Sequence, residues 1–147
     1  MITYNEFIWK WNQKPCNYDG QLGNQCVDLM RQYCQDVLGV NGYTAIPPTG
    51  NAIDIFNNFK NNKYFRKVIN NPNDTNHPKK GDIVFYEKKA FLYGKAGHVE
   101  ICDQADGYYM VNFSQNWPTG KWCGFVKRGS NKLFHGYRGC VGWLTRV

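Results

Sequence analysis

The stretch "GNQCVDLMRQYC" (Gly23–Cys34) is the most informative part of the chain, because it places a cysteine between a loop and a helix. Residues 14–25 contain the proline, asparagine, aspartate and glycine that are typical of a loop. Apolar side chains at helical spacing follow and Gly39 is a stop signal, so a helix is predicted over residues 26–38. Cys26 then begins this helix, where free N–H groups and the helix dipole favour a thiolate. The position of Cys26 alone fits a buried structural cysteine better than a nucleophile.

The rest of the chain divides into an early helical part and a later strand part. Residues 2–12 predict a helix whose Thr3 and Glu6 form a capping box, and residues 51–59 predict a short helix capped by Asn51. Residues 41–51 are expected to be irregular. "YFRKVI" predicts a strand, and "DIVFYEK", "GHVEICDQ", "YYMVNFSQ", "WCGFVKR" and "FHGYRGCVGWLTRV" predict more. This order indicates an α+β fold with N-terminal helices packed on an antiparallel β-sheet.

Length and composition indicate one globular domain over residues 1–147. Hydrophobic residues make up 42% of the chain, which excludes a disordered protein, and no apolar run is long enough to predict a membrane span. The net charge of +7 favours an anionic partner such as a cell envelope, or simply a soluble basic surface. No block of like charge predicts a nucleic-acid tail. The N-terminus lacks the pattern of a signal peptide.

The cysteines predict chemistry at one or two positions only. No C-x-x-C pair and no zinc-finger spacing occurs among the six, so most are expected to be reduced and structural. A zinc site built from Cys26 and His98 lacks a recognisable third and fourth ligand. The cysteines without an assigned role are Cys16, Cys34, Cys102, Cys123 and Cys140.

A base for Cys26 is the second component of a nucleophilic site. His98 begins a predicted strand directly after Gly97, whereas His77 and His135 lie in a loop and in a late strand or turn. The turn "ADG" predicts a hairpin in which a two-residue loop puts Gln115 opposite His98. A three-residue loop puts Ser114 or Asn116 there instead. The group that orients the imidazole is therefore expected from "SQN", with Asn116 as first choice.

These pieces together resemble the CHAP family, the cysteine, histidine-dependent amidohydrolases/peptidases of phage lysins and bacterial wall hydrolases. The resemblance is carried by "GNQCVDL", "HPKKGDIVFYE", "AGHVEI" and "SQNW", in the order that the family has them. It implies a papain-like fold of the NlpC/P60-like superfamily and hydrolysis of an amide bond in peptidoglycan, as an endopeptidase or an N-acetylmuramoyl-L-alanine amidase. A single CHAP catalytic domain would then span residues 1–147.

The resemblance also implies roles for individual residues. Cys26 is similar in position to the nucleophile and His98 to the general base. Asn116 matches the asparagine of the family's E-Q-N-W ending, whereas Ser114 stands where many members have glutamate. Either Asn116 orients His98 without a carboxylate, which is the preferred interpretation, or activity is reduced; Ser114 and Gln25 are the supporting candidates. The Cys26 backbone N–H is expected in the oxyanion hole, with Gln25 or Tyr18 as the second donor. Trp117 and Tyr109 are expected to line the cleft or to pack in the core.

Well-known phage members of the family carry a calcium loop just before the cysteine, and "NYDGQLGNQCVD" is similar to it. Side-chain ligands for Ca²⁺ would come from Asn17, Asp19 and Asp28, and backbone carbonyls from Gln21 and Gly23. Two aspartates and one asparagine predict a weak site, because calcium takes several carboxylates. An Asx-turn without a metal explains the same residues equally well. No cofactor is required for the chemistry itself.

The expected partners are peptidoglycan and anionic wall polymers, without nucleic acid. The chain is expected to act at the bacterial cell wall, as a monomer or as part of a larger lysin or virion assembly. Delivery would use a holin, the virion or another secretion route. Two other functions remain open: a CHAP-like wall-binding module without turnover, favoured by Ser114, and a cysteine-dependent acyl transferase.

Overall fold

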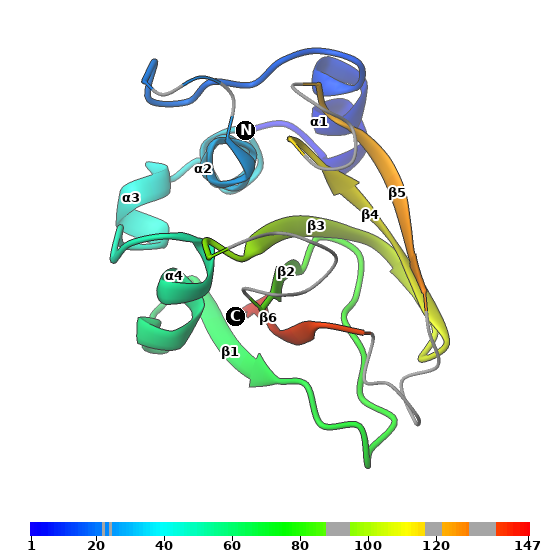
Figure 1. Cartoon of the computed structure of the whole chain (residues 1–147). Helices are drawn as coiled ribbons and strands as arrows, with labels where there is room; N and C mark the ends of the chain where they lie inside the picture. The colour runs from blue at the N-terminus through cyan, green and yellow to red at the C-terminus, as the bar shows by residue number, and fades with distance from the viewer. Residues whose placement is uncertain (22, 24, 88–94, 117–121, 130–137) are drawn as a thin grey trace.

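A computed structural model describes residues 1–21, 23, 25–87, 95–116, 122–129 and 138–147. In the described residues four helices come before the first strand in the chain, and the strands then follow one another (Figure 1). The helices are α1 (Tyr4–Trp11), α2 (Cys26–Leu38), α3 (Gly42–Ala45) and α4 (Ala52–Asn58). The strands are β1 (Phe65–Ile69), β2 (Ile83–Tyr86), β3 (His98–Ala105), β4 (Tyr109–Ser114), β5 (Gly124–Gly129) and β6 (Cys140–Arg146). The predicted α+β class is confirmed.

The described strands form one antiparallel sheet in the order β1-β6-β2-β3-β4-β5. Strands β2 to β5 are sequential neighbours, as hairpin connections require, and β6 returns to lie between β1 and β2. This return joins the C-terminal strand to the first one. Strand β3 is therefore interior, with a paired neighbour along each edge.

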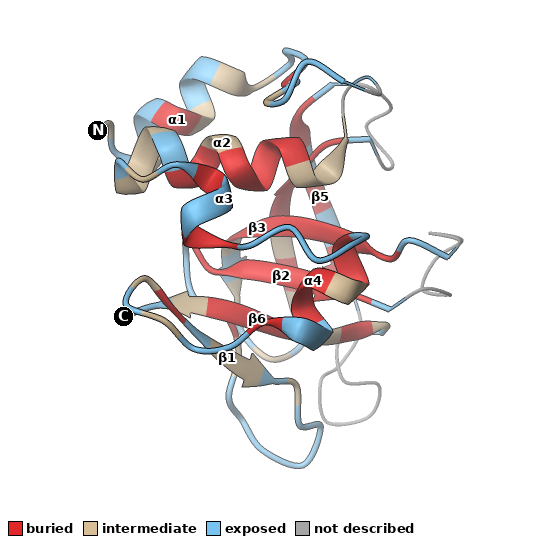
Figure 2. Ribbon diagram, turned by 90° about the vertical axis from the view of Figure 1, so that its left-hand side faces the viewer, coloured by how far each residue is buried: buried red, intermediate tan, exposed pale blue. Residues whose placement is uncertain are grey.

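Helices pack over one face of this sheet. The larger hydrophobic core joins Phe7 of α1, Leu29 of α2 and Phe56 of α4 to strand residues such as Ile101 and Phe113. Figure 2 shows buried positions along α2 and the central strands. A second cluster contains Val84, Tyr86, Cys102, Met110, Cys140 and Trp143. Because side chains alternate along a strand, Cys102 shares its face with Glu100 and His98.

The helix boundaries follow from local hydrogen bonds. Thr3 and Glu6 make the predicted capping box of α1, and Gly39 ends α2 in the left-handed conformation, with a φ of 70°. Asn51 is the N-cap of α4 as predicted. The expectation of an irregular segment at 41–51 is wrong at α3, where the Asn41 side chain accepts hydrogen bonds from the N–H groups of residues 43 and 44. An asparagine cap without apolar periodicity gave too weak a signal for this single turn.

The β3–β4 hairpin differs from the predicted register. Ala105 pairs with Met110, so the register at the turn matches neither the two-residue nor the three-residue loop that was considered. The register then shifts between Cys102 and Gln104, and Ile101 pairs with Phe113. A bulge of this kind changes the register by one residue, which loop length alone does not reveal.

Among the described residues, no helix is long and apolar enough to cross a membrane.

Candidate active site

Cys26 is the first residue of α2 and is half-buried. The N-cap residue Gln25 donates its backbone N–H to Asp28 Oδ2 at 2.8 Å, which fixes the entry of the chain into the helix. The first N–H groups of a helix have no partner further back in the helix, and here the Asp28 N–H donates to the Gln25 carbonyl oxygen at 3.1 Å. All six cysteines are free thiols. Cys26 is the one that is not buried.

The buried cysteines are poorly suited to react. Burial raises the pKa of Cys16, Cys34, Cys102 and Cys123 above that of an ordinary thiol. Because their pKa is raised, these side chains remain protonated at neutral pH, whereas the reactive form of a cysteine is the thiolate. The expectation that most cysteines are reduced and structural agrees with this arrangement.

Gln115 ties the segment before Cys26 to the end of β4. Its Nε2 donates to the carbonyl oxygens of Cys16 at 2.7 Å and Gln25 at 2.8 Å. Its Oε1 accepts from the Cys16 N–H at 2.6 Å and from the Cys123 thiol at 3.2 Å. Gln115 is completely buried. These contacts fix the loop that leads into α2, so Gln115 positions the start of the helix.

His98 begins β3 directly after Gly97, which has a φ of +69°. A Cβ at Gly97 would lie 2.7 Å from the Tyr86 carbonyl oxygen and 2.9 Å from Ile53 Cβ, so only glycine fits without movement. Glycine is thus required at position 97 for both steric and conformational reasons. The buried His98 side chain is hydrogen-bonded to Cys26. The structure therefore brings together a helix-start thiol and an imidazole.

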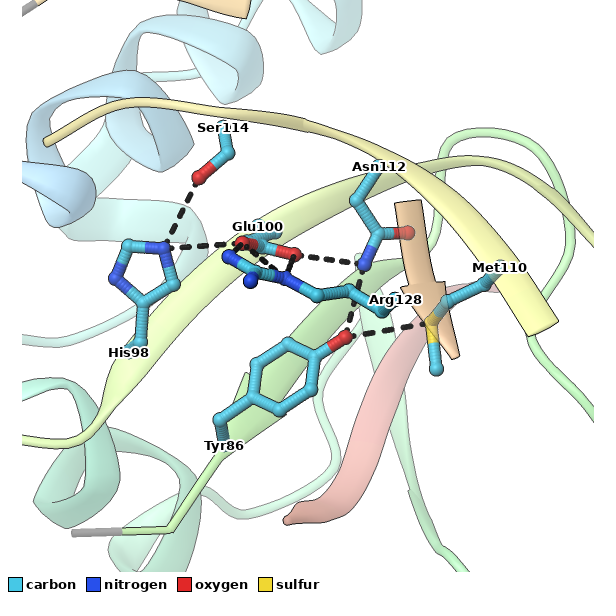
Figure 3. Close-up of polar contacts among 7 residues, drawn as sticks. All are labelled: Tyr86, His98, Glu100, Met110, Asn112, Ser114 and Arg128. Atoms are coloured by element: carbon cyan, nitrogen blue, oxygen red, sulfur yellow. Dashed lines mark hydrogen bonds and ion pairs between the residues drawn. The ribbon is translucent and has the colours of Figure 1, made fainter. Parts of the chain in front are cut away.

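The far side of the imidazole is held by two oxygens. His98 Nε2 lies 3.0 Å from Ser114 Oγ and 3.1 Å from Glu100 Oε1 (Figure 3). An ionised carboxylate can only accept hydrogen bonds, so Nε2 carries a hydrogen. This arrangement leaves Nδ1 as the ring nitrogen for Cys26. The tautomer is the one in which Nδ1 can take the thiol proton.

Glu100 belongs to a buried polar network that crosses the four strands β2 to β5. Arg128 Nε lies 3.0 and 3.1 Å from its two carboxylate oxygens, and Arg128 Nη2 also contacts Oε1. Asn112 Nδ2 donates to Glu100 Oε2 at 2.8 Å and to the Tyr86 hydroxyl at 3.0 Å. Figure 3 shows these side chains converging on the Glu100 carboxylate.

The network sets the charge of both groups. Burial alone would lower the pKa of His98, but hydrogen bonds and charge interactions with Cys26 and Glu100 raise it to about 9. Burial alone would raise the pKa of Glu100, but hydrogen bonds from His98 and Arg128 lower it to about 2. The imidazolium and the carboxylate are therefore both favoured at neutral pH. Such shifts are common at functional sites.

Asn116, the first choice as orienting residue, does not occupy that place. Strand β4 ends at Ser114, and Asn116 follows in the left-handed region with a φ of 75° and an exposed side chain. The chain has left the sheet before Asn116 could face the imidazole. Ser114 and Glu100 make the orienting contacts with His98 instead.

The structure also describes three other residues that the sequence analysis named, Tyr18, Tyr109 and Gln25. The Tyr18 hydroxyl donates to Gln35 Oε1 at 2.8 Å and accepts from the Gly42 N–H at 3.1 Å, so it serves to dock α3 on α2. Tyr109 lies at the hairpin end of β4, opposite the end that carries Ser114. Gln25 lies beside Cys26 as the N-cap. Trp117 lies outside the described residues.

The segment before Cys26 is organised by its own hydrogen bonds. Asp19 Oδ1 accepts from the Gln21 N–H at 2.8 Å, which is an Asx-turn, and the Asp28 carboxylate accepts backbone hydrogen bonds from Gln25 and Asp19. Asn17, Gln21 and Gly23 are exposed. Within the described part of the chain, no three acidic, histidine or cysteine side chains form a metal-binding group. Calcium takes roughly six to eight oxygens, and the expected ligands here include an amide side chain and backbone carbonyls, so the calcium site stays a prediction.

Sequence reasoning missed Glu100. The signal was available in "HVE", because residues two apart on a strand share a face. Once His98 is a candidate base at the start of a strand, a carboxylate at position 100 lies on the same side of the sheet. Arg128 could not be found this way, because its place beside Glu100 depends on the pairing of β5 with β4.

Comparison with known proteins identifies the family. The model of the CHAP domain matches residues 15–116, more than half of the chain, and this segment contains Cys26 and His98. The chain therefore belongs to the CHAP domain family. No curated protein sequence matches it significantly.

Solved structures share the fold. The structure described as "Crystal structure of a wild type endolysin LysIME-EF1" matches with a TM-score of 0.71 and 22% identity, over 99% of this chain and 64% of that one. "The crystal structure of Ly7917 with the hydrolyzing product of MDP" matches with a TM-score of 0.59 and 19% identity, over 85% of this chain and 55% of that one. The chain thus spans less than two thirds of either protein. Both likenesses show the fold alone.

Proposed function

We propose that this chain is a peptidoglycan hydrolase that cleaves an amide bond of the stem peptide or cross-bridge through Cys26 and His98. The observation that carries the proposal is the hydrogen bond between the helix-start thiol and an imidazole whose other nitrogen is held by a carboxylate. Membership of the CHAP domain family and the fold shared with endolysins support it.

The first half of the reaction forms an acyl-enzyme. With its raised pKa, His98 holds the proton of the Cys26 thiol on Nδ1, and the Cys26 thiolate attacks the amide carbonyl carbon. The Cys26 backbone N–H at the helix start donates to the oxyanion that develops. The tetrahedral intermediate collapses, the C–N bond breaks, and His98 gives its proton to the leaving amine. The product is a thioester on Cys26 and a free amine.

The second half releases the acyl group. His98 is now neutral and takes a proton from water, which attacks the thioester carbonyl. The C–S bond breaks, a carboxylic acid leaves, and the thiol–imidazole pair is restored. The reaction needs no metal or organic cofactor. The bond that is cut distinguishes an endopeptidase, which acts between amino acids, from an amidase, which separates the glycan from the stem.

Two further features support a wall substrate. The net charge of +7 favours approach to anionic wall polymers. The solved structure of Ly7917 contains what its authors describe as the hydrolyzing product of MDP. Action at the bacterial cell wall, as a monomer or within a larger lysin or virion assembly, follows from the proposal. The route by which the chain reaches the wall is part of the same proposal: a holin, the virion or another secretion route.

The proposal is tested by digesting purified Gram-positive peptidoglycan with the protein and analysing the fragments by mass spectrometry. The wild-type chain is compared with Cys26→Ala and His98→Ala, and His77→Ala serves as the matched histidine control in the polar loop before β2. New amine and carboxyl ends are expected with the wild type and His77→Ala and absent with the other two. The fragment masses identify the bond.

Two results contradict the proposal. Release of the same ends by Cys26→Ala would remove Cys26 from the chemistry. Intact peptidoglycan that retains the bound protein would indicate a wall-binding module without turnover. A transferase would join the acyl group to an added amine and leave no new carboxyl end.

A further inference from the structure

The strongest unexplained feature of the molecule is the buried carboxylate of Glu100. Glu100 is 1% exposed, and its partners His98, Asn112 and Arg128 come from β3, β4 and β5. An ionised group without water must be balanced by charge and hydrogen bonds. Here the balance consists of one guanidinium, one amide and one imidazole. The ring of His98 is therefore part of the set that keeps this carboxylate charged.

Arg128 and Asn112 fix where the carboxylate points. The guanidinium contacts both oxygens, and Asn112 Nδ2 contacts Oε2 while also donating to Tyr86 (Figure 3). A two-oxygen contact with arginine restricts rotation of the carboxylate as well as supplying charge. Oε1 is thereby held 3.1 Å from His98 Nε2. The direction of the His98 hydrogen bond is set by strands β4 and β5.

Stability alone does not account for the arrangement. Burying an ion pair is often no more stabilising than well-packed apolar side chains, because both ions lose water. A pair built only for packing would be complete with Glu100 and Arg128. Instead the carboxylate shares Oε1 between Arg128 and the imidazole that contacts Cys26. Ser114 Oγ touches the same nitrogen at 3.0 Å, but a neutral hydroxyl cannot balance an imidazolium charge.

We infer that Glu100 is the positioning residue of His98, and that Arg128 and Asn112 hold its carboxylate for that role. Glu100 accepts the hydrogen bond from the Nε2–H of His98 throughout the reaction and remains ionised. It keeps Nδ1 directed at Cys26 and stabilises the imidazolium that forms when the thiol proton moves to the ring. The carboxylate on strand β3 thus supplies the charge that Ser114 lacks on strand β4. The inference rests on the proposed function of Cys26 and His98.

The test removes the charge of Glu100 and separates its effect on His98 from its effect on folding. Glu100→Gln keeps the shape but leaves the Arg128 charge without its partner. The double variant Glu100→Gln/Arg128→Met removes both charges, so it is expected to fold even where the single variant does not. The exposed Glu87 gives the control Glu87→Gln. Each full chain is assayed for release of amine ends from peptidoglycan and for thermal unfolding.

The second measurement is the pH at which the His98 ring titrates, followed by NMR of histidine labelled with nitrogen-15. A merely structural role would leave it unchanged in a folded variant. The inference predicts that both Glu100 variants titrate at least about one pH unit lower than the wild type. It also predicts that turnover falls by about 100-fold or more in both. Glu87→Gln is expected to match the wild type in both measurements.

The outcomes distinguish the inference from the proposed function. Wild-type turnover and titration in the folded double variant would mean that Glu100 serves only to neutralise Arg128, and would overturn the inference. That result would leave the proposed function intact as long as Cys26→Ala is inactive. An active Cys26→Ala would instead remove the proposed function itself, whatever Glu100 does.

Discussion

The substitution Gln115→Leu tests how the start of α2 is held in place. Gln115 satisfies both the N–H and the carbonyl oxygen of Cys16, which is completely buried. Leucine has a similar size but can make neither bond. Leaving a buried polar group without a partner costs about 1–3 kcal/mol, so the two groups of Cys16 amount to about 2–6 kcal/mol. The half-buried carbonyl of Gln25 adds a smaller loss, since water can reach it.

The assay is urea unfolding followed by circular dichroism. A loss of this size is a large part of the roughly 5–15 kcal/mol that stabilises a domain, and it lowers the urea midpoint by about 1 M or more. The matched control is Gln104→Leu, since Gln104 is exposed on β3 and its replacement is expected to change the free energy of unfolding by less than about 0.5 kcal/mol. A midpoint for Gln115→Leu within the error of the wild type would refute the account of the loop before Cys26.

Three further predictions concern the histidine strand and the loop before Cys26. Gly97→Ala is expected to lower the free energy of unfolding by about 2 kcal/mol or more, because alanine is strained at this left-handed φ and its Cβ meets the Tyr86 carbonyl oxygen. Urea unfolding of this variant checks the prediction, and an unchanged midpoint would contradict it. The raised pKa of His98 stabilises the fold fully below its unfolded value of about 6.5, and this contribution is lost as the pH rises through about 9. Urea midpoints of the wild type are therefore expected to fall towards that of His98→Gln between pH 7 and pH 10, whereas a constant difference would speak against the raised pKa. Because Asp19 and Asp28 already accept backbone hydrogen bonds, EDTA is expected to change peptidoglycan hydrolysis less than about twofold, and loss of activity restored by added calcium would reveal a metal site in that loop.

Local signals were sufficient to predict much of the fold. The bounds of α2 follow from a loop composition before Cys26 and the left-handed Gly39 after Leu38, and both features act within a few residues. The strands were recognisable because β-branched and aromatic runs are separated by turn residues. These signals do not depend on which segments meet in space.

The parts that could not be predicted depend on long-range pairing. The bulge between Cys102 and Gln104 sets which residues of β4 lie near His98, and a bulge has no clear sequence signature here. Asn116 was expected at the imidazole from the pairing of a three-residue loop, but strand β4 ends at Ser114 and Asn116 has left the sheet. Arg128 comes from a strand whose register is fixed only by pairing with β4.

The candidate site shows the same division. Cys26 at a helix start and His98 beside a glycine were chosen from residue type and local position, and the structure places these two side chains in contact. Their orienting group was not predictable in this way, because Glu100 on β3 is held in place by Asn112 on β4 and Arg128 on β5. The choice of Asn116 overlooked the carboxylate of Glu100, which the two-residue alternation of β3 places on the same face as His98.

The central claim is that Cys26 is the one activated thiol among six and that it carries the hydrolysis. The most direct measurement treats the native protein with one equivalent of iodoacetamide at pH 7 and locates the modification by peptide mass spectrometry, while release of amine ends from peptidoglycan is followed in parallel. The account predicts that Cys26 alone is alkylated, because the other cysteines are buried, and that activity falls in proportion. Alkylation of another cysteine first, or full activity with Cys26 modified, would contradict it.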